Sequence, residues 1–172
     1  MQSLSSGVQY RHWPVEDAKA CLLLAHGLAE HTGRYEHVAA RFNERGVAVV
    51  GPDHMGHGAS PGIRVYLKAF SEYLEPMQAL RARIDEWYPG RPVFLFGHSM
   101  GGLISAHLLL ESQAEFQGAM LSGPAFHAVD PGSAPLLWVG RVLKKVLPKL
   151  GMVSLDANGV SRDPAVVADY LA

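Results

Sequence analysis

A serine between two glycines is the feature of this sequence best suited to chemistry. Gly97-His98-Ser99-Met100-Gly101 fits the pattern G-x-S-x-G, in which the serine hydroxyl attacks a carbonyl carbon. The apolar run 93–96 precedes the pattern and a helical pattern follows it, so the serine is expected at a sharp turn between a strand and a helix. We therefore predict that Ser99 is a nucleophile and that the Met100 N–H faces the oxyanion formed by its attack.

A second oxyanion donor is expected from the loop after an earlier strand. His26-Gly27-Leu28 follows the apolar run 20–24, which has the length of a strand, and the Leu28 N–H is the candidate donor. For the His26 side chain we favour a structural role, in which a buried imidazole holds the loop by hydrogen bonds. The N–H groups of Leu28 and Met100 are thus the predicted oxyanion hole.

A histidine-rich stretch, Asp53 to Ser60, follows the apolar run 47–50. Its two histidines, His54 and His57, are three residues apart, so a metal site and a tightly turned loop are alternatives. No cysteine and no longer ligand pattern accompanies them, and the nearby glycines permit a tight turn. We favour the loop and predict no metal ion.

The elements that must position these residues alternate between short apolar runs and helical patterns. Short, continuous apolar runs suit strands that are buried on both faces. The alternation predicts an α/β fold, with a mostly parallel sheet covered by helices on both faces. Pro76 is expected to kink a helix or to start a new one. The expected strands are 8–13, 20–24, 47–50, 93–96 and 118–121, and the expected helices are 35–45, 70–87 and 99–110.

Composition excludes several classes of protein. The 172 residues are 48% hydrophobic, which is ample for a packed core and excludes wholesale disorder. The 15 Lys and Arg balance 16 Asp and Glu, so no net charge attracts nucleic acid, and no such partner is expected. The single cysteine, Cys21, cannot form an internal disulfide. A signal-peptide pattern and a membrane-spanning apolar run are both absent from the sequence, so a cytoplasmic protein is expected.

Three longer motifs together resemble the monoacylglycerol lipase and lysophospholipase group of α/β-hydrolases, which belongs with the serine aminopeptidase S33-like hydrolases. The motifs are His26 to Tyr35 (HGLAEHTGRY), Asp53 to Ser60 (DHMGHGAS) and Gly97 to Gly102 (GHSMGG). The resemblance implies the α/β-hydrolase fold and a serine hydrolase without a cofactor. It implies monoacylglycerol or a similar single-chain lipid ester as the substrate. Lysophospholipase and general carboxylesterase activities share these motifs and stay open.

The same resemblance implies roles for individual residues. Ser99 corresponds to the nucleophile, and the N–H groups of Leu28 and Met100 correspond to the oxyanion hole. Three further residues correspond to a loop that organises the site near the glycerol end: Glu30, His31 and Arg34. The supporting motif residues are His26, Gly27, Gly97, His98 and Gly101.

The acid and histidine of a triad do not occur in the order that this fold uses, which is Ser, acid, His. The histidines after Ser99 are His107 and His127, and both precede every downstream aspartate. His107 is eight residues into the expected helix, about 12 Å from the serine along it. Three alternatives stay open. The favoured one is that this is the N-terminal part of a hydrolase whose C-terminal strands and helices are absent here. The others are a lipid-binding pseudo-hydrolase, and a fold completed by a C-terminal fragment or a second chain.

The character of the sequence changes after Pro124. We predict the N-terminal part of a hydrolase core over residues 1–129 and a helical cap over residues 130–172, which the resemblance identifies with the lid over an acyl tunnel. The run 136–150 is apolar and basic and has no acidic residue. Such a segment lies on a lipid surface or packs on the core with solvated lysines, and both alternatives stay open. Peripheral membrane contact through the cap is one expectation.

Overall fold

The computed structural model describes residues 1–127 and 161–171 of the chain. The chain divides into two compact units, Met1–Ala128 and Val129–Ala172, and each is described by itself. The first unit contains the sheet and every predicted site residue.

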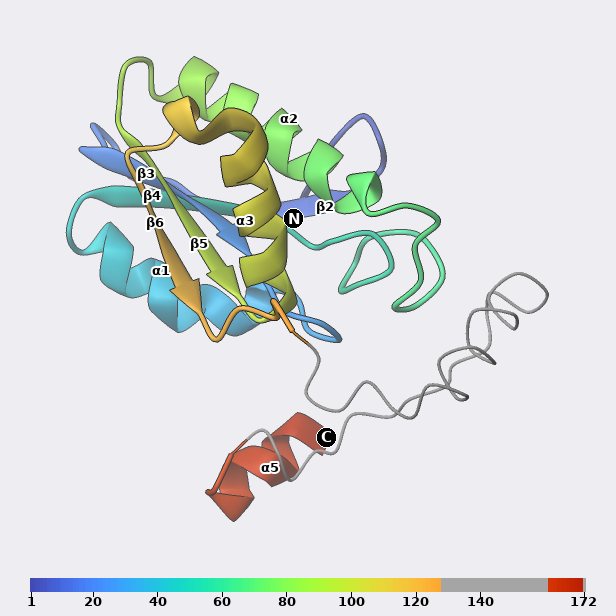
Figure 1. The fold of residues 1–172 in the computed structure, drawn as a ribbon. Helices are drawn as coiled ribbons and strands as arrows, with labels where there is room; N and C mark the ends of the chain where they lie inside the picture. Colours follow the sequence, from blue (N-terminus) through green and yellow to red (C-terminus); the bar gives the residue numbers. More distant parts are fainter. Residues whose placement is uncertain (128–160, 172) are drawn as a thin grey trace. The chain divides into compact units, whose positions relative to one another are not determined.

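Six strands form one sheet in the order β1-β2-β4-β3-β5-β6 (Figure 1). The two strands nearest the N-terminus are antiparallel to their neighbours, whereas β4, β3, β5 and β6 are mutually parallel. The carboxyl ends of these four strands therefore meet at one edge of the sheet. The strands are β1 (Gln2–Ser3), β2 (Gln9–Trp13), β3 (Ala20–Ala25), β4 (Val47–Pro52), β5 (Val93–His98) and β6 (Gly118–Ser122).

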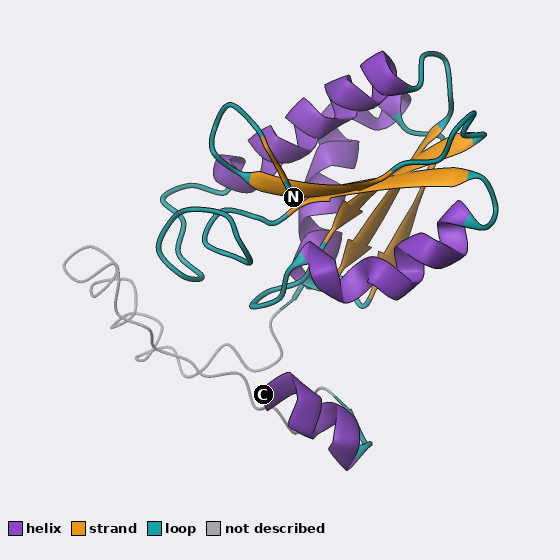
Figure 2. Cartoon of the chain, turned by 180° about the vertical axis from the view of Figure 1, so that it is seen from behind, coloured by secondary structure: helices purple, strands orange, loops and turns teal. Residues whose placement is uncertain are grey.

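Helices cover both faces of this sheet (Figure 2). The helix α1 (Glu36–Asn43) lies on one face, and α2 (Ser71–Trp87) and α3 (Met100–Ser112) lie on the other. Strand β3 is buried on both sides, because Leu22 and Leu24 face α1 while Leu23 faces the opposite core. Burying each of these leucine side chains stabilises the fold by about 2 kcal/mol. The two short 3₁₀ helices are η1 (Thr32–Tyr35) and η2 (Gln113–Glu115).

The predicted order of elements is confirmed, with boundaries that differ by a few residues. The mostly parallel sheet with helices on both faces is the arrangement that the sequence predicts. The expectation that Pro76 starts a new helix is wrong, because α2 continues through it. Pro76 lies in the second turn, where the missing N–H removes only one helical hydrogen bond, and its ring is buried.

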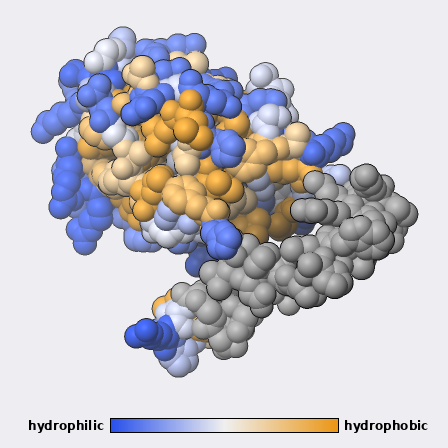
Figure 3. All heavy atoms as spheres, in the orientation of Figure 1, coloured by the Kyte–Doolittle hydropathy of each residue, from blue (hydrophilic) through white to orange (hydrophobic). Residues whose placement is uncertain are grey.

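An apolar surface extends over α3 and β6. Strand β6 pairs with β5 and is the last strand of the sheet in the described part of the chain. Figure 3 shows hydrophobic residues gathered over these two elements. Three of the exposed large hydrophobic residues lie on or just after them: Leu110 (85% exposed), Met120 (40%) and Phe126 (59%).

The described part of the second unit is one short helix. Helix α5 (Pro164–Leu171) begins with a proline in its first turn, and the Asp163 carboxylate accepts a hydrogen bond from the Ala165 N–H at 2.9 Å. The predicted cap, including the basic run 136–150, lies mostly outside the described residues. Among the described helices, none is long and apolar enough to cross a membrane.

Candidate active site

Ser99 occupies a strained turn between β5 and α3. Its backbone has φ 51° and ψ −114°, a conformation that residues other than glycine rarely adopt. The Ser99 N–H donates to the Ser122 carbonyl at 2.9 Å, and the Ser99 carbonyl accepts from Ala125 at 3.0 Å. The end of β6 thus holds the turn in place from its other side.

The glycines that flank Ser99 are required by space. A Cβ at Gly97 would overlap the Gly101 carbonyl and the Ser105 hydroxyl. A Cβ at Gly101 would overlap the carbonyl groups of Ala25 and His26, at the carboxyl end of β3. Neither φ is in the left-handed region, so it is close backbone packing that excludes a side chain here. The predicted tight strand-to-helix turn is therefore present.

The Ser99 hydroxyl has no hydrogen-bond partner among residues 1–127 and 161–171. The neighbouring His98 makes no hydrogen bond to this hydroxyl, and its Nδ1 instead lies 3.1 Å from the Ser122 carbonyl. The more distant His107 packs its ring on Phe70, at a centroid distance of 4.6 Å. Met100 begins α3, and the N–H groups of a first helical turn have no partner four residues earlier. The predicted nucleophile and one of the two predicted oxyanion donors are therefore adjacent at this turn, and no hydrogen bond joins the Ser99 hydroxyl to a histidine of the described residues.

The loop of residues 26–31, here called the His26 loop, carries the second predicted donor. The buried His26 ring links two segments: its Nε2 accepts the His54 N–H at 2.9 Å, and its Nδ1 lies 2.7 Å from the Gly27 carbonyl. Because Nε2 accepts, the proton is assigned to Nδ1, which donates to that carbonyl. These bonds give His26 the loop-holding role that the sequence predicts. Leu28 is 36% exposed, and Ala29 after it has φ 58°.

Glu30 closes the His26 loop on itself. Its Oε1 accepts hydrogen bonds from the Gly27 N–H and from the Tyr35 hydroxyl, the latter at 2.6 Å. Its Oε2 lies 3.7 Å from Arg34 Nε. Exposed His31 caps η1, because its Nδ1 accepts the Gly33 N–H at 3.1 Å. Of the three residues predicted near the glycerol end, Glu30 therefore holds the segment that presents Leu28, Arg34 pairs with Glu30, and His31 caps the helix that follows.

The stretch of residues 53–60, here called the Asp53 loop, is built around one buried carboxylate. Asp53 Oδ1 accepts from the Thr32 N–H at 2.9 Å and from the Thr32 hydroxyl, while Oδ2 accepts from the Ala59 N–H at 2.9 Å. Burial alone would raise the pKa of Asp53, but these hydrogen bonds outweigh it and lower the pKa. The ionised carboxylate thus joins the Asp53 loop to η1.

Three histidine rings gather beneath these loops. The His54 ring lies 4.4 Å from that of His26 and 5.2 Å from that of Tyr73, and the His57 ring is 5.4 Å from His26. Burial lowers the pKa of His26 to about 4 and lowers the pKa of His54 and His57 as well, with the mutual repulsion of protonated rings adding to the effect at His26 and His54. The rings are therefore neutral at pH 7. His54 and His57 lie within the Asp53 loop, and among the described residues no group of three or more His, Cys, Asp or Glu side chains is placed so that it could hold a metal ion.

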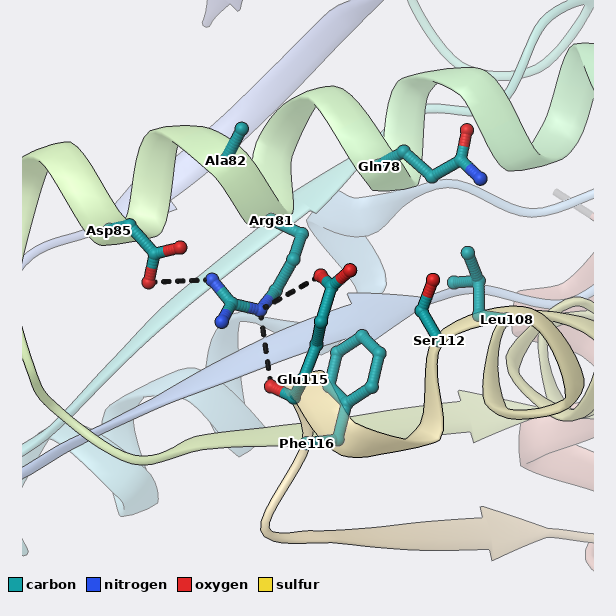
Figure 4. Close-up of a pocket in the computed structure, with 8 residues that line it drawn as sticks. All are labelled: Gln78, Arg81, Ala82, Asp85, Leu108, Ser112, Glu115 and Phe116. Atoms are coloured by element: carbon teal, nitrogen blue, oxygen red, sulfur yellow. Dashed lines mark hydrogen bonds and ion pairs between the residues drawn. The ribbon is translucent and has the colours of Figure 1, made fainter.

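Two of the cavities in the first unit lie at opposite ends of the strands. One of about 330 Å³ borders the His26 loop and the Asp53 loop, and its lining includes Glu30, His31 and Arg64. The other, of about 410 Å³, lies between α2 and the end of α3 (Figure 4). There Arg81 forms ion pairs with Asp85 at 2.7 Å and with Glu115 at 3.7 Å, so the charged side chains that line this cavity are paired with one another. Because η2 precedes β6, that cavity is at the amino ends of the strands, away from Ser99.

Sequence reasoning did not single out two anchors of the site, Asp53 and Tyr35. Asp53 begins the stretch that alternates polar residues with glycine, and a short acidic side chain there is a signal for loop-closing hydrogen bonds. The sequence predicts Tyr35 at the start of a helix, and the structure places it at the end of η1, directly before α1, where its hydroxyl donates to Glu30. No pattern in the sequence predicts that contact, because Tyr35 also has the spacing of a core residue.

Comparison with known proteins agrees with this geometry. The family model described as serine aminopeptidase, S33, matches residues 16–172. The chain is 43% identical to a monoacylglycerol lipase of Mycolicibacterium smegmatis over 96% of its length, and 36% identical to the human monoglyceride lipase over 93%. A crystal structure of a Paleococcus ferrophilus monoacylglycerol lipase superposes with a TM-score of 0.82 at 28% identity, over 95% of this chain and 62% of that one.

The chain spans 59% of the length of the mycobacterial relative and 54% of the human one. Within that span lie the parallel sheet, the elbow at Ser99 and the two loops beside it. With the family model matched over most of its length, the chain belongs to the serine aminopeptidase S33 family and has the α/β-hydrolase fold.

Proposed function

We propose that the protein is a serine ester hydrolase that releases a fatty acid from monoacylglycerol or a similar single-chain lipid ester. The observation that carries this proposal is the geometry of Ser99. A non-glycine residue is held at φ 51° at the start of α3, between glycines that admit no side chain. Strain of this kind persists only where the surrounding structure imposes it, and it is concentrated at functional sites. The identity with monoacylglycerol lipases supports the substrate class.

The proposed chemistry is acyl transfer. Ser99 Oγ attacks the ester carbonyl carbon and gives its proton to a histidine base, and the N–H groups of Leu28 and Met100 stabilise the oxyanion. The tetrahedral intermediate collapses, and glycerol leaves with the proton from the histidine. Water then attacks the acyl-enzyme, which releases the fatty acid and restores Ser99. The histidine and its orienting carboxylate come from outside the described residues in this proposal, and no cofactor takes part.

The remaining parts of the site have supporting roles. Glu30, His31 and Arg34 set the shape of the site near the alcohol end of the substrate, because Glu30 holds the loop that carries Leu28, Arg34 pairs with Glu30, and His31 caps the helix after that loop. Residues 130–172 form the cap over the acyl chain and contact the membrane from the cytoplasmic side. A further segment or chain completes the sheet beyond β6.

Hydrolysis of monoacylglycerol by the full-length protein tests this proposal. Ser99→Ala should lower the rate by about 10³-fold or more, because the nucleophile is lost while the donors remain. Ser112→Ala, which changes a partly exposed serine at the other end of α3, is the matched control and should leave the rate unchanged. An undiminished rate in Ser99→Ala would overturn the assignment of the nucleophile.

A panel of substrates separates the related activities. Monoacylglycerols, lysophospholipids and short soluble esters share the ester bond but differ in the alcohol and in the acyl length. We expect the highest kcat/KM for monoacylglycerol. Binding of monoacylglycerol without hydrolysis of any of the three would instead identify a pseudo-hydrolase.

A further inference from the structure

Apolar side chains are exposed on the connection between β4 and α2. Ile63 is 43% exposed and Val65 is 48% exposed, within the segment of residues 61–68, here called the Ile63 loop. Figure 1 shows this connection, coloured teal to green, as long loops beside the first turn of α2. Exposed large apolar residues that lie close together on a surface are typical of a binding site.

The Ile63 loop is held in one conformation by the Asp53 loop. The Gly56 N–H donates to the Pro61 carbonyl at 2.8 Å, and the Gly56 carbonyl accepts from the Val65 N–H at 3.2 Å. The Arg64 guanidinium also donates to the Gly58 carbonyl at 2.8 Å. The exposure of Ile63 and Val65 is therefore a built feature of the fold.

Val65 is held in an unfavourable backbone conformation. Its φ is 56°, which is a genuine outlier for a β-branched residue. In the described part of the chain, the other non-glycine residues with positive φ are Ala29 and Ser99, both in the candidate active site, and Asp17, in the turn between β2 and β3. Backbone strain of this kind is concentrated at functional sites. The strain and the exposure coincide in the Ile63 loop.

The charge of the Ile63 loop is positive. Arg64 and Lys68 are exposed, and no acidic residue occurs from Ser60 to Ser71. The following acidic residue, Glu72, accepts hydrogen bonds from the backbone N–H groups of Lys68 and Ala69 at 3.1 and 3.2 Å. Two cations beside two exposed aliphatic side chains match a surface that is anionic at its face and apolar beneath it.

The Ile63 loop lies next to the candidate active site. Arg64 and Val65 line the same cavity as Ala29 and Glu30, the residues that follow the predicted oxyanion donor Leu28. Leu28 is itself 36% exposed. A surface that receives the Ile63 loop would therefore lie beside the segment that carries this donor.

We propose that the Ile63 loop docks on an anionic lipid membrane, with Ile63 and Val65 inserted among the lipids and Arg64 and Lys68 against the head groups. This membrane contact is distinct from any that residues 130–172 make. The docking proposal rests on the proposed function in one respect, which is the use of the contact: docking brings the site to the surface that holds a single-chain lipid ester.

Vesicle binding by the full-length protein tests the docking directly. The Ser99→Ala background removes hydrolysis, and vesicles of phosphatidylcholine with and without phosphatidylglycerol are the probes. The pair Ile63→Gln and Lys68→Gln should lower partitioning onto the anionic vesicles by about tenfold or more. The matched control pair is Leu110→Gln and Lys19→Gln, which removes one exposed aliphatic group and one exposed cation near the amino ends of the strands. It should change partitioning by less than about twofold.

The docking proposal would be overturned if the two pairs of substitutions lowered partitioning onto anionic vesicles equally, or if the Ile63 loop pair did not lower it. In the background with Ser99 intact, the Ile63 loop pair should keep its rate on a soluble short ester and lose rate only on vesicle-borne substrate. A protein that hydrolyses no ester but still needs the Ile63 loop for vesicle binding would refute the proposed function alone. A protein that hydrolyses soluble ester and binds vesicles without this loop would refute the docking alone.

Discussion

The elbow at Ser99 and the loops beside it are built by different forces. The elbow depends on the absence of side chains, because Gly97 and Gly101 let backbone segments of β5, α3 and β3 come into contact. The Asp53 loop and the His26 loop depend on buried polar groups, chiefly the Asp53 carboxylate and the His26 imidazole. Steric contact does not change with pH, whereas the two polar anchors titrate. The two regions should therefore fail in different ways.

Adding one methyl group to the elbow should have the largest effect. Gly101→Ala places a Cβ against the carbonyl groups of Ala25 and His26, which are backbone atoms that cannot rotate away. We expect a loss of about 3 kcal/mol or more in the free energy of unfolding, and loss of ester hydrolysis. Urea denaturation of the full-length protein measures the first quantity.

Gly90→Ala is the matched control for that change. Gly90 has φ 73°, but no atom lies within 4 Å of the added Cβ. The cost should therefore be only the conformational penalty, about 1 kcal/mol. Equal destabilisation by the two variants would contradict the view that space, rather than backbone conformation, requires glycine at position 101.

Removing the charge of the polar anchor should have a smaller effect. Asp53→Asn replaces one accepting oxygen by an NH₂ group, which then faces the N–H of Thr32 or Ala59. We expect a loss of about 2 kcal/mol, measured as a shift in the urea midpoint.

Asp85→Asn is the control for the charge itself. Asp85 is ion-paired with Arg81 at 2.7 Å, but its side chain is 58% exposed. Such surface pairs contribute less than about 1 kcal/mol. If Asp85→Asn were as destabilising as Asp53→Asn, the Asp53 loop would not depend on its buried hydrogen bonds.

Acid should weaken the polar region. Burial holds the pKa of His26 at about 4 in the folded state, below the ordinary value of 6.5 that the unfolded chain would have. The unfolded state therefore binds a proton first, and stability is lost as the pH falls from about 6.5 towards 4. Protonation of His26 in the unfolded state alone costs about 1.4 kcal/mol per pH unit within this window. Urea midpoints at pH 7.0, 6.0 and 5.0 measure this loss of stability.

His54→Phe should reduce this acid sensitivity with the smallest change at neutral pH. Both ring nitrogens of His54 are buried without a hydrogen-bond partner in the described part of the chain, and phenylalanine keeps an aromatic ring beside Tyr73. At pH 7 the stability should change by about 1 kcal/mol or less. An unchanged dependence on pH would mean that His54 does not contribute to the acid loss.

Much of the fold was predictable because its core strands carry a strong local signal. The apolar runs 20–24 and 93–96 indicate strands without reference to distant residues, and the structure has strands Ala20–Ala25 and Val93–His98 there. The sharp turn at Ser99 was also predictable, because a serine flanked by two glycines directly after such a run is typical of a strand-to-helix elbow. Helix α2 shows the limit of local rules, since they allow a new helix to start at Pro76 and one helix passes through it.

The polar contacts of the site were less predictable because they join residues far apart in the chain. Thr32 reaches Asp53 across 21 residues, and His54 reaches His26 across 28. Composition and spacing mark such side chains as loop residues, but they do not pair them. The strain at Ala29 and Val65 had no signal either, because nothing in their residue types favours a positive φ.

By itself, the sequence determined the alternation of strands and helices and the residue that sits at the elbow. Apolar periodicity and the steric demands of glycine act within a few residues, so they are visible in the chain. Only the tertiary structure decided which groups hold the His26 loop, how the buried histidines are kept neutral, and that the Ile63 loop is exposed beside them. Those outcomes depend on desolvation and on distances between distant segments, and both arise only when the chain has folded.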